Sequence, residues 1–256
     1  MEETIIAVSP YKASILKALY NAIIVKLSNF VLVGNKKKII ETCFVHNISH
    51  SLFEIVDCEN DIDICFAVND LVKKRKTIGM LIGDLSEIYI KNIAQIEYEI
   101  NVVDVPFSNH LLFISNYLKD EYIGYEEKAN SIKACKGLMN DLKIKYVNIG
   151  LVSGQASKIM NIEKNIMKMD NTLDDDNIDV IGINDIFEEQ YNLLVFNNID
   201  ASKIFIDTII MNDRSKYANL KKASNTYVVD ANKMKLKDVF FSIFLLHKIT
   251  LNSKAS

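Results

Sequence analysis

The feature that most constrains the fold is a repeated alternation between short apolar runs and amphipathic segments of ten or more residues. Ser9 and Pro10 predict the start of a first helix, because serine is a preferred N-cap and proline is favoured at the first helical position. After it, strands are expected at 30–34, 53–58, 78–83 and 100–105, and helices at 36–45, 61–74 and 86–98. Strands that are apolar on both faces and separated by helices predict parallel sheets covered by helices.

A second set of apolar runs and helical patterns follows Pro106. Strands are expected at 111–115, 146–153, 178–183, 191–196 and 226–230, and helices at 125–142, 156–169, 202–213 and 236–250. We therefore expect an α/β protein with two lobes, the first made of residues 1–105 and about 235–256 and the second of 106–234. A cleft between the lobes is the expected place for a ligand.

Charge and hydropathy narrow the classes of partner. The 256 residues carry a formal net charge of −3, which gives no strong attraction to nucleic acid or to an anionic membrane. The nearest candidate for a membrane span, "VFFSIFLLHKI" at 239–249, is too short to cross a bilayer. The N-terminus lacks the pattern of a signal peptide, and the four cysteines have no paired spacing. We expect a cytoplasmic protein without a nucleic-acid or membrane partner.

Few residues suggest a bound cofactor or metal. The glycine-rich fingerprints of nucleotide-binding loops are absent. Cys43, His46 and His50 have a spacing that could suit zinc, but the sequence shows no fourth ligand nearby, and a chance surface grouping is the better interpretation. We expect no metal and no covalently bound cofactor.

Candidate ligand-binding residues lie where strands end and helices begin. Parallel sheets bind ligands beyond the carboxyl ends of their strands, and helix N-termini attract anions. Residues at such turns are Gly34, Gly83, Asp84, Ser86, Ser115, Asn116, Asn184 and Asp185. Because any α/β fold has such turns, they predict where a ligand would bind and not which ligand it is.

Four stretches of the sequence follow the order and partial motifs of one known family. They are "IAVSPYKASILKALYNAIIVKLSNFVLVGNKKKI", "GMLIGDLSEIYIKNI", "LLFISNYLKDEYIGYEEKANSIKACKGLMNDLKI" with its Lys128, and "YNLLVFNNIDASKIF". Through them the chain resembles the phosphate acetyltransferase and phosphate butyryltransferase family. The resemblance implies a two-lobed phosphate acyltransferase or isocitrate dehydrogenase-like fold, acyl-coenzyme A and phosphate as substrates, and self-association as a homodimer or larger homo-oligomer.

The sequence departs from that family where anion-binding groups are expected. Gly83 and Asp84 replace a lysine-glycine pair, and Ser115 and Asn116 replace a threonine-aspartate pair. The segment at 184–190 is shortened, and 215–225 lacks the glycine and arginine of the family's loop. Loss of one oxyanion donor already lowers a rate roughly 100- to 1000-fold. We expect a divergent member in which acyl transfer is impaired or lost and binding of a ligand or partner is retained.

Two other interpretations stay open. The chain could be an active acyltransferase in which Arg214, Lys221 and Lys222 bind phosphate and Ser115 or Asn116 orients the acyl group. It could also be a generic two-lobed small-molecule-binding protein that shares only the α/β topology.

Overall fold

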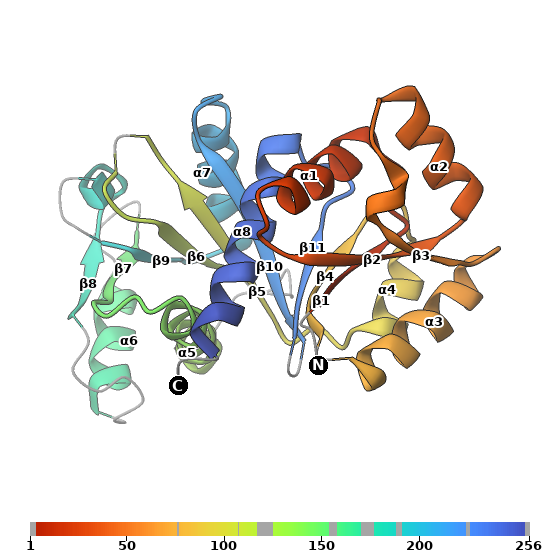
Figure 1. The fold of residues 1–256 in the computed structure, drawn as a ribbon. Helices are drawn as coiled ribbons and strands as arrows, with labels where there is room; N and C mark the ends of the chain where they lie inside the picture. Colours follow the sequence, from red (N-terminus) through yellow and green to blue (C-terminus); the bar gives the residue numbers. More distant parts are fainter. Residues whose placement is uncertain are drawn as a thin grey trace. The chain divides into compact units, whose positions relative to one another are not determined.

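The chain divides into two compact α/β units, one formed by Met1–Glu97 and Ala218–Ser256 and the other by Tyr98–Tyr217. The computed structural model (Figure 1) describes residues 4–75, 77–106, 108–116, 125–153, 158–169, 177–187, 191–223 and 226–253. Each unit has its own part of the strand order and its own covering helices.

The sheet of the first unit is mainly parallel. Its strands, in spatial order, are β3 (Glu54–Asp57), β2 (Asn29–Gly34), β1 (Thr4–Val8), β4 (Thr77–Ile82), β11 (Thr226–Asp230) and β10 (Lys216–Ala223). β1 pairs in parallel with β2 and β4, and β4 pairs in parallel with β11. β10 and β11 form an antiparallel pair.

Helices cover the sheet of the first unit. They are α1 (Ala13–Ile24), α2 (Lys36–Val45), α3 (Asp61–Lys74), α4 (Glu87–Ile93) and α8 (Leu236–Ser253), with a short 3-10 helix at His50–Leu52. α1 packs on α8, and α3 packs on α4 (Figure 1). Ile64, Val68 and Leu71 of α3 form a buried core with Ile6 and Val8 of β1. The 3.6-residue period therefore places one face of α3 against the sheet.

Local signals explain why α3 begins and ends where it does. Asn60 is its N-cap, and its side-chain oxygen accepts hydrogen bonds from the backbone N–H groups of Ile62 and Asp63. Acidic residues occupy the first turn, and Lys73 and Lys74 occupy the last. Negative charge at the N-terminus and positive charge at the C-terminus interact favourably with the helix dipole, so they stabilise both ends together with the Asn60 cap.

The sheet of the second unit has one antiparallel pair followed by parallel strands. Its strands, in spatial order, are β5 (Tyr98–Asp104), β6 (Leu112–Asn116), β9 (Leu193–Phe196), β7 (Asn148–Val152) and β8 (Asn177–Ile181). Its helices are α5 (Tyr125–Asp141), α6 (Lys158–Met169) and α7 (Ile199–Ile210), with a 3-10 helix, η2, at Ile183–Phe187. β5 and β6 are antiparallel, whereas β6, β9, β7 and β8 pair in parallel.

The predicted fold class, α/β with mainly parallel sheets covered by helices, is confirmed. The two units divide near residues 97 and 217, whereas the sequence suggested boundaries near 105 and 234. The reason lies in strand pairing, because β11 pairs with β4 of the first unit and β5 pairs with β6 of the second. The cleft between lobes stays a prediction. No helix in the described part of the chain has both the length and the apolarity needed to span a bilayer.

Candidate functional site

The parallel strands of the second unit bring polar side chains to one edge of its sheet. β6, β9 and β7 run in the same direction, so their carboxyl ends lie at the same edge. Ser115 lies near the end of β6, and Asn197 directly follows β9. Lys128 and Ser131 of α5 and Glu163 of α6 approach this edge. These five residues are called the polar cluster below.

Lys128 is the centre of the polar cluster. Its side chain is fully buried, and its Nζ donates to Glu163 Oε2 at 2.5 Å and to Asn197 Oδ1 at 3.2 Å. Glu163 is only 6% exposed, so both charges are withdrawn from water. Such a pair is tolerated because mutual attraction and further hydrogen bonds offset the lost hydration. Lys128 and Glu163 together carry no net charge that would attract an anion.

The predicted catalytic candidate Ser115 belongs to the interior of the second unit. It is 1% exposed, and its Oγ lies 3.2 Å from Ser131 Oγ. Ser131 Oγ in turn lies 2.8 Å from the carbonyl oxygen of Lys128. The side chain of Ser115 is therefore buried and hydrogen-bonded to a serine of α5. Asn116, the other candidate, ends β6, and its side chain lies outside the described part of the chain.

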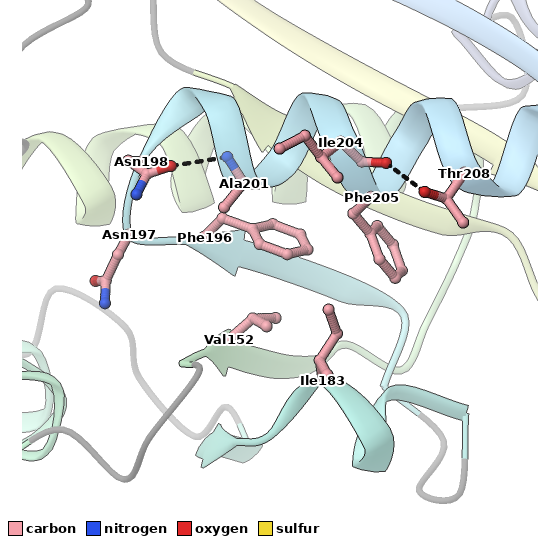
Figure 2. Close-up of a pocket in the computed structure, with 9 residues that line it drawn as sticks. All are labelled: Val152, Ile183, Phe196, Asn197, Asn198, Ala201, Ile204, Phe205 and Thr208. Carbon is pink, nitrogen blue, oxygen red and sulfur yellow. Dashed lines mark hydrogen bonds between the residues drawn. The ribbon is translucent and has the colours of Figure 1, made fainter.

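A pocket of about 480 Å³ (Figure 2) adjoins the polar cluster, because Asn197 both lines the pocket and accepts from Lys128. Its lining comprises Val152, Ile183, Phe196, Asn197, Asn198, Ala201, Ile204, Phe205 and Thr208. Figure 2 shows the rings of Phe196 and Phe205 between α7 and β9, with Val152 and Ile183 facing them from β7 and η2. The ring centroids of Phe196 and Phe205 are 5.2 Å apart. The pocket has the size and apolar lining of a small-molecule site.

At the turn after Gly34, backbone N–H groups donate hydrogen bonds to side chains of the same chain. Gly34 has φ of +153°, and a Cβ there would lie 2.7 Å from the Tyr11 hydroxyl oxygen. The N–H of Asn35 donates to the same hydroxyl, and the N–H of Lys36 donates to Asp57 Oδ1 at 2.9 Å. The side chain of Asn35 caps α2 by accepting from the N–H of Lys38. The start of α2 is therefore capped by side chains of the chain itself.

The turn after β4 is held in the same way. The N–H groups of Gly83 and Asp84 donate to the carbonyl oxygens of Val8 and Ser9 at 2.8 and 2.9 Å, and the N–H of Leu85 donates to Gly83 at 3.1 Å. A Cβ at position 83 would overlap the carbonyl oxygen of Ser9. Asp84 and Ser86 are exposed, and Ser86 makes no side-chain cap to α4. Glycine at 83 thus permits a close approach between two backbone segments.

The prediction that Ser9 caps the first helix is wrong. α1 begins at Ala13, with Lys12 at the N-cap position. Ser9 has a left-handed backbone with φ of 46°, and its carbonyl oxygen accepts from Tyr11 and Asp84. The contact with the Gly83 turn therefore sets the conformation of Ser9.

The remaining predicted residues occupy three separate places. Asn184 and Asp185 lie in η2, where Asp185 Oδ2 accepts from the N–H of Gly182 at 2.9 Å. Arg214 is exposed in the turn after α7 of the second unit. Lys221 and Lys222 lie on β10 in the first unit, and as consecutive strand residues they point to opposite faces. Lys222 Nζ lies 4.3 Å from the ring centroid of Tyr227.

No family model matches the chain, and no curated protein matches its sequence. A branched-chain phosphotransacylase from Enterococcus faecalis V583 superposes with a TM-score of 0.73 at 13% identity, covering 98% of this chain and 100% of that one. The EutD phosphotransacetylase from Staphylococcus aureus superposes with a TM-score of 0.69 at 11% identity, covering 96% and 94%. This chain has the phosphotransacylase fold.

A solved structure of a different kind of enzyme also superposes on this chain. A 4-hydroxythreonine-4-phosphate dehydrogenase from Burkholderia phymatum superposes with a TM-score of 0.63 at 8% identity, covering 97% of this chain and 98% of that one. The fold predicted from the resemblance is therefore confirmed, but one fold can host several reactions. The function of this phosphotransacylase-fold protein therefore depends on its own residues.

The cysteines of this phosphotransacylase-fold protein are buried thiols. Burial raises the pKa of Cys43, Cys58, Cys65 and Cys135, which disfavours the reactive thiolate. Cys43 is fully buried in α2, whereas His50 is exposed. Across the described ranges, no group of three or more His, Cys, Asp or Glu side chains converges as metal ligands would.

Sequence reasoning missed most of the polar cluster and the whole pocket. The sequence motif includes Lys128 without indicating a partner for it, and no local pattern points to Glu163 or Asn197. The signal that points to the polar cluster is the position of Lys128 among apolar residues of α5 such as Ala129 and Ile132, because a buried lysine needs a partner. That partner lies 35 residues away, on another helix.

Proposed function

We propose that this phosphotransacylase-fold protein binds a small-molecule ligand and has lost efficient acyl transfer between coenzyme A and phosphate. Acyl transfer to phosphate needs cations and N–H donors that hold phosphate and stabilise the developing oxyanion. The fold supports a site for small molecules, and the described turns offer few such donors. Self-association and a cytoplasmic location remain part of the proposal.

One observation carries the proposal. At the turn after β4, three consecutive N–H groups, those of Gly83, Asp84 and Leu85, donate to carbonyl oxygens of the chain. The exposed carboxylate of Asp84 adds a negative charge to the same turn. A phosphate would have to displace these hydrogen bonds and approach a like charge, and both cost free energy.

A thiol-release assay tests this proposal. The protein is incubated with acetyl- or butyryl-coenzyme A and phosphate, and free thiol is followed with a protein-only blank that corrects for the four buried cysteines. We expect kcat/KM at least about 1000-fold below that of the Enterococcus faecalis phosphotransacylase assayed alongside, because the N–H groups of the turn after β4 are already bonded within the chain and Asp84 carries a negative charge there. A rate within about tenfold of that enzyme would refute the loss of acyl transfer.

The variant Asp84→Lys separates the effect of charge from that of the closed turn. If the occupied N–H groups prevent anion binding, a lysine at 84 should change coenzyme A affinity by less than about fivefold, because an exposed charge contributes about 1 kcal/mol at most. Calorimetric titration measures the affinity, and Asp207→Lys on the exposed side of α7 controls for the change in net charge. A gain of about 100-fold in Asp84→Lys alone would show that charge was the obstacle.

A further inference from the structure

The pocket of the second unit has a lining that selects against charged ligands. Most of its lining is apolar, and none of the nine described residues that form it carries a charge. An ionised group that entered this pocket would lose hydration without gaining an opposite charge from these nine residues. The adjacent Lys128 does not supply one, because it is fully buried and paired with Glu163.

Large apolar side chains remain exposed at the pocket. Ile183 of η2 is 54% exposed, and Ile204 of α7 is 67% exposed. Phe187, which stacks on the lining residue Phe205 with ring centroids 6.2 Å apart, is 45% exposed. Exposed apolar groups gathered around a concave surface mark a binding site, because a ligand that covers them removes apolar area from water.

Two asparagines supply oriented hydrogen-bond donors at one end of the pocket. Asn197 Oδ1 accepts from Lys128 Nζ, which can only donate, and Asn198 Oδ1 accepts from the N–H of Ala201 at 2.7 Å. Each bond engages the amide oxygen, so the NH₂ group is the part of each side chain that can donate to a ligand. Figure 2 shows both asparagines where β9 passes into α7. The hydroxyl of Thr208 donates to the carbonyl oxygen of Ile204 and so stays within α7.

We propose that this pocket binds an uncharged aliphatic molecule that carries a carbonyl group. The aliphatic part contacts Phe196 and Phe205, and the carbonyl oxygen accepts from the NH₂ group of Asn197 or Asn198. The inference rests on the proposed ligand-binding function and deepens it by naming the ligand class. Neither phosphate nor coenzyme A is needed for this binding.

The test compares two probes of nearly the same shape and different charge. The full chain, labelled at isoleucine, alanine and valine methyl groups, is titrated with 4-methylpentanamide and with 4-methylpentanoate and followed by NMR. We expect saturable shifts at Val152, Ile183, Ala201 and Ile204 with the amide and at least about tenfold weaker binding of the carboxylate. Equal or tighter binding of the carboxylate, or no saturable shift at these methyls, would overturn the proposal.

Variants with a matched control locate the binding. Ala201→Leu fills the pocket and should weaken amide binding at least about tenfold, and Ile204→Ser should weaken it about fivefold through lost apolar contact. Ile162→Ser alters an isoleucine of similar exposure on α6, 58% against 67%, and should leave the affinity unchanged. Equal affinities in Ala201→Leu and the unaltered protein would overturn the assignment.

This test and the thiol-release assay can fail separately. The amide contains neither a thioester nor a phosphate, so its binding does not depend on acyl transfer. Efficient thiol release together with saturable pocket shifts would refute the loss of acyl transfer and support ligand binding in the pocket. Slow thiol release without pocket shifts would support the loss of acyl transfer and refute ligand binding in the pocket.

Discussion

Replacing Lys128 with methionine is expected to lower the free energy of unfolding by about 3–5 kcal/mol, because it leaves a buried carboxylate without its counter-charge. In the native protein, Glu163 is 6% exposed and its Oε2 lies 2.5 Å from Lys128 Nζ. Methionine is close to lysine in length and removes the charge without leaving a large cavity. Urea unfolding followed by circular dichroism measures the loss.

A double variant shows whether the loss comes from the unpaired charge. Lys128→Met combined with Glu163→Met removes both charges and should recover most of the stability, because an apolar pair often replaces a buried ion pair at little cost. Lys74→Met, which breaks an exposed ion pair with Asp70, is the control and should cost less than about 1 kcal/mol. If Lys128→Met costs no more than Lys74→Met, the buried pair is not a strong structural constraint.

Replacing Gly83 with alanine is expected to lower the free energy of unfolding by about 3 kcal/mol, at the upper end for an added methyl group in a tightly packed place. The new Cβ would overlap the carbonyl oxygen of Ser9 and lie 3.0 Å from its carbonyl carbon. These are backbone atoms of a neighbouring segment, so no side-chain rotation relieves the contact. The hydrogen bonds from Gly83 and Asp84 to Val8 and Ser9 would have to lengthen.

Gly137→Ala provides the matched control for Gly83→Ala. Gly137 lies within α5, and a Cβ built there meets nothing within 4 Å. Because alanine is a better helix former than glycine, this variant should gain about 0.5–1 kcal/mol. The two glycines should therefore respond with opposite signs in the same unfolding measurement. A loss below about 1 kcal/mol for Gly83→Ala would contradict the close approach of the two segments.

Elements with strong local signals were predicted well. The helices expected at 36–45 and 61–74 have those bounds in the structure, as does the strand at 226–230. Each of the two helices has an asparagine N-cap and a regular apolar face. Caps and periodicity act over a few residues, so the sequence alone carries them.

Elements that depend on distant partners were predicted less well. β10 was not expected, because "KYANLKKA" is rich in polar residues and becomes a strand by pairing with β11. The helix expected at 86–98 ends at Ile93, because residues from Tyr98 pair with β6 as β5. The helix expected at 202–213 begins at Ile199, since Asn198 is its N-cap. Tertiary pairing overrides local propensity in the first two cases.

The strand-end location of a ligand site stays a prediction, and the composition of the polar cluster could not be predicted from the sequence. The carboxyl ends of strands were expected to carry such a site, and Ser115 does lie in the polar cluster. The partners of Lys128 come from α6 and from the end of β9, which no local pattern connects. The pocket likewise combines β7, η2, β9 and α7. Such groupings follow from topology and side-chain packing and cannot be derived from spacing along the chain.

The most direct test of the central claim is the reaction in the other direction. Acetyl or butyryl phosphate is mixed with coenzyme A and the protein, and formation of the thioester is followed by its absorbance, which protein thiols do not disturb. The account predicts a rate at least about 1000-fold below that of the Enterococcus faecalis phosphotransacylase under the same conditions. A rate within about tenfold of that enzyme, for either acyl group, would contradict the account.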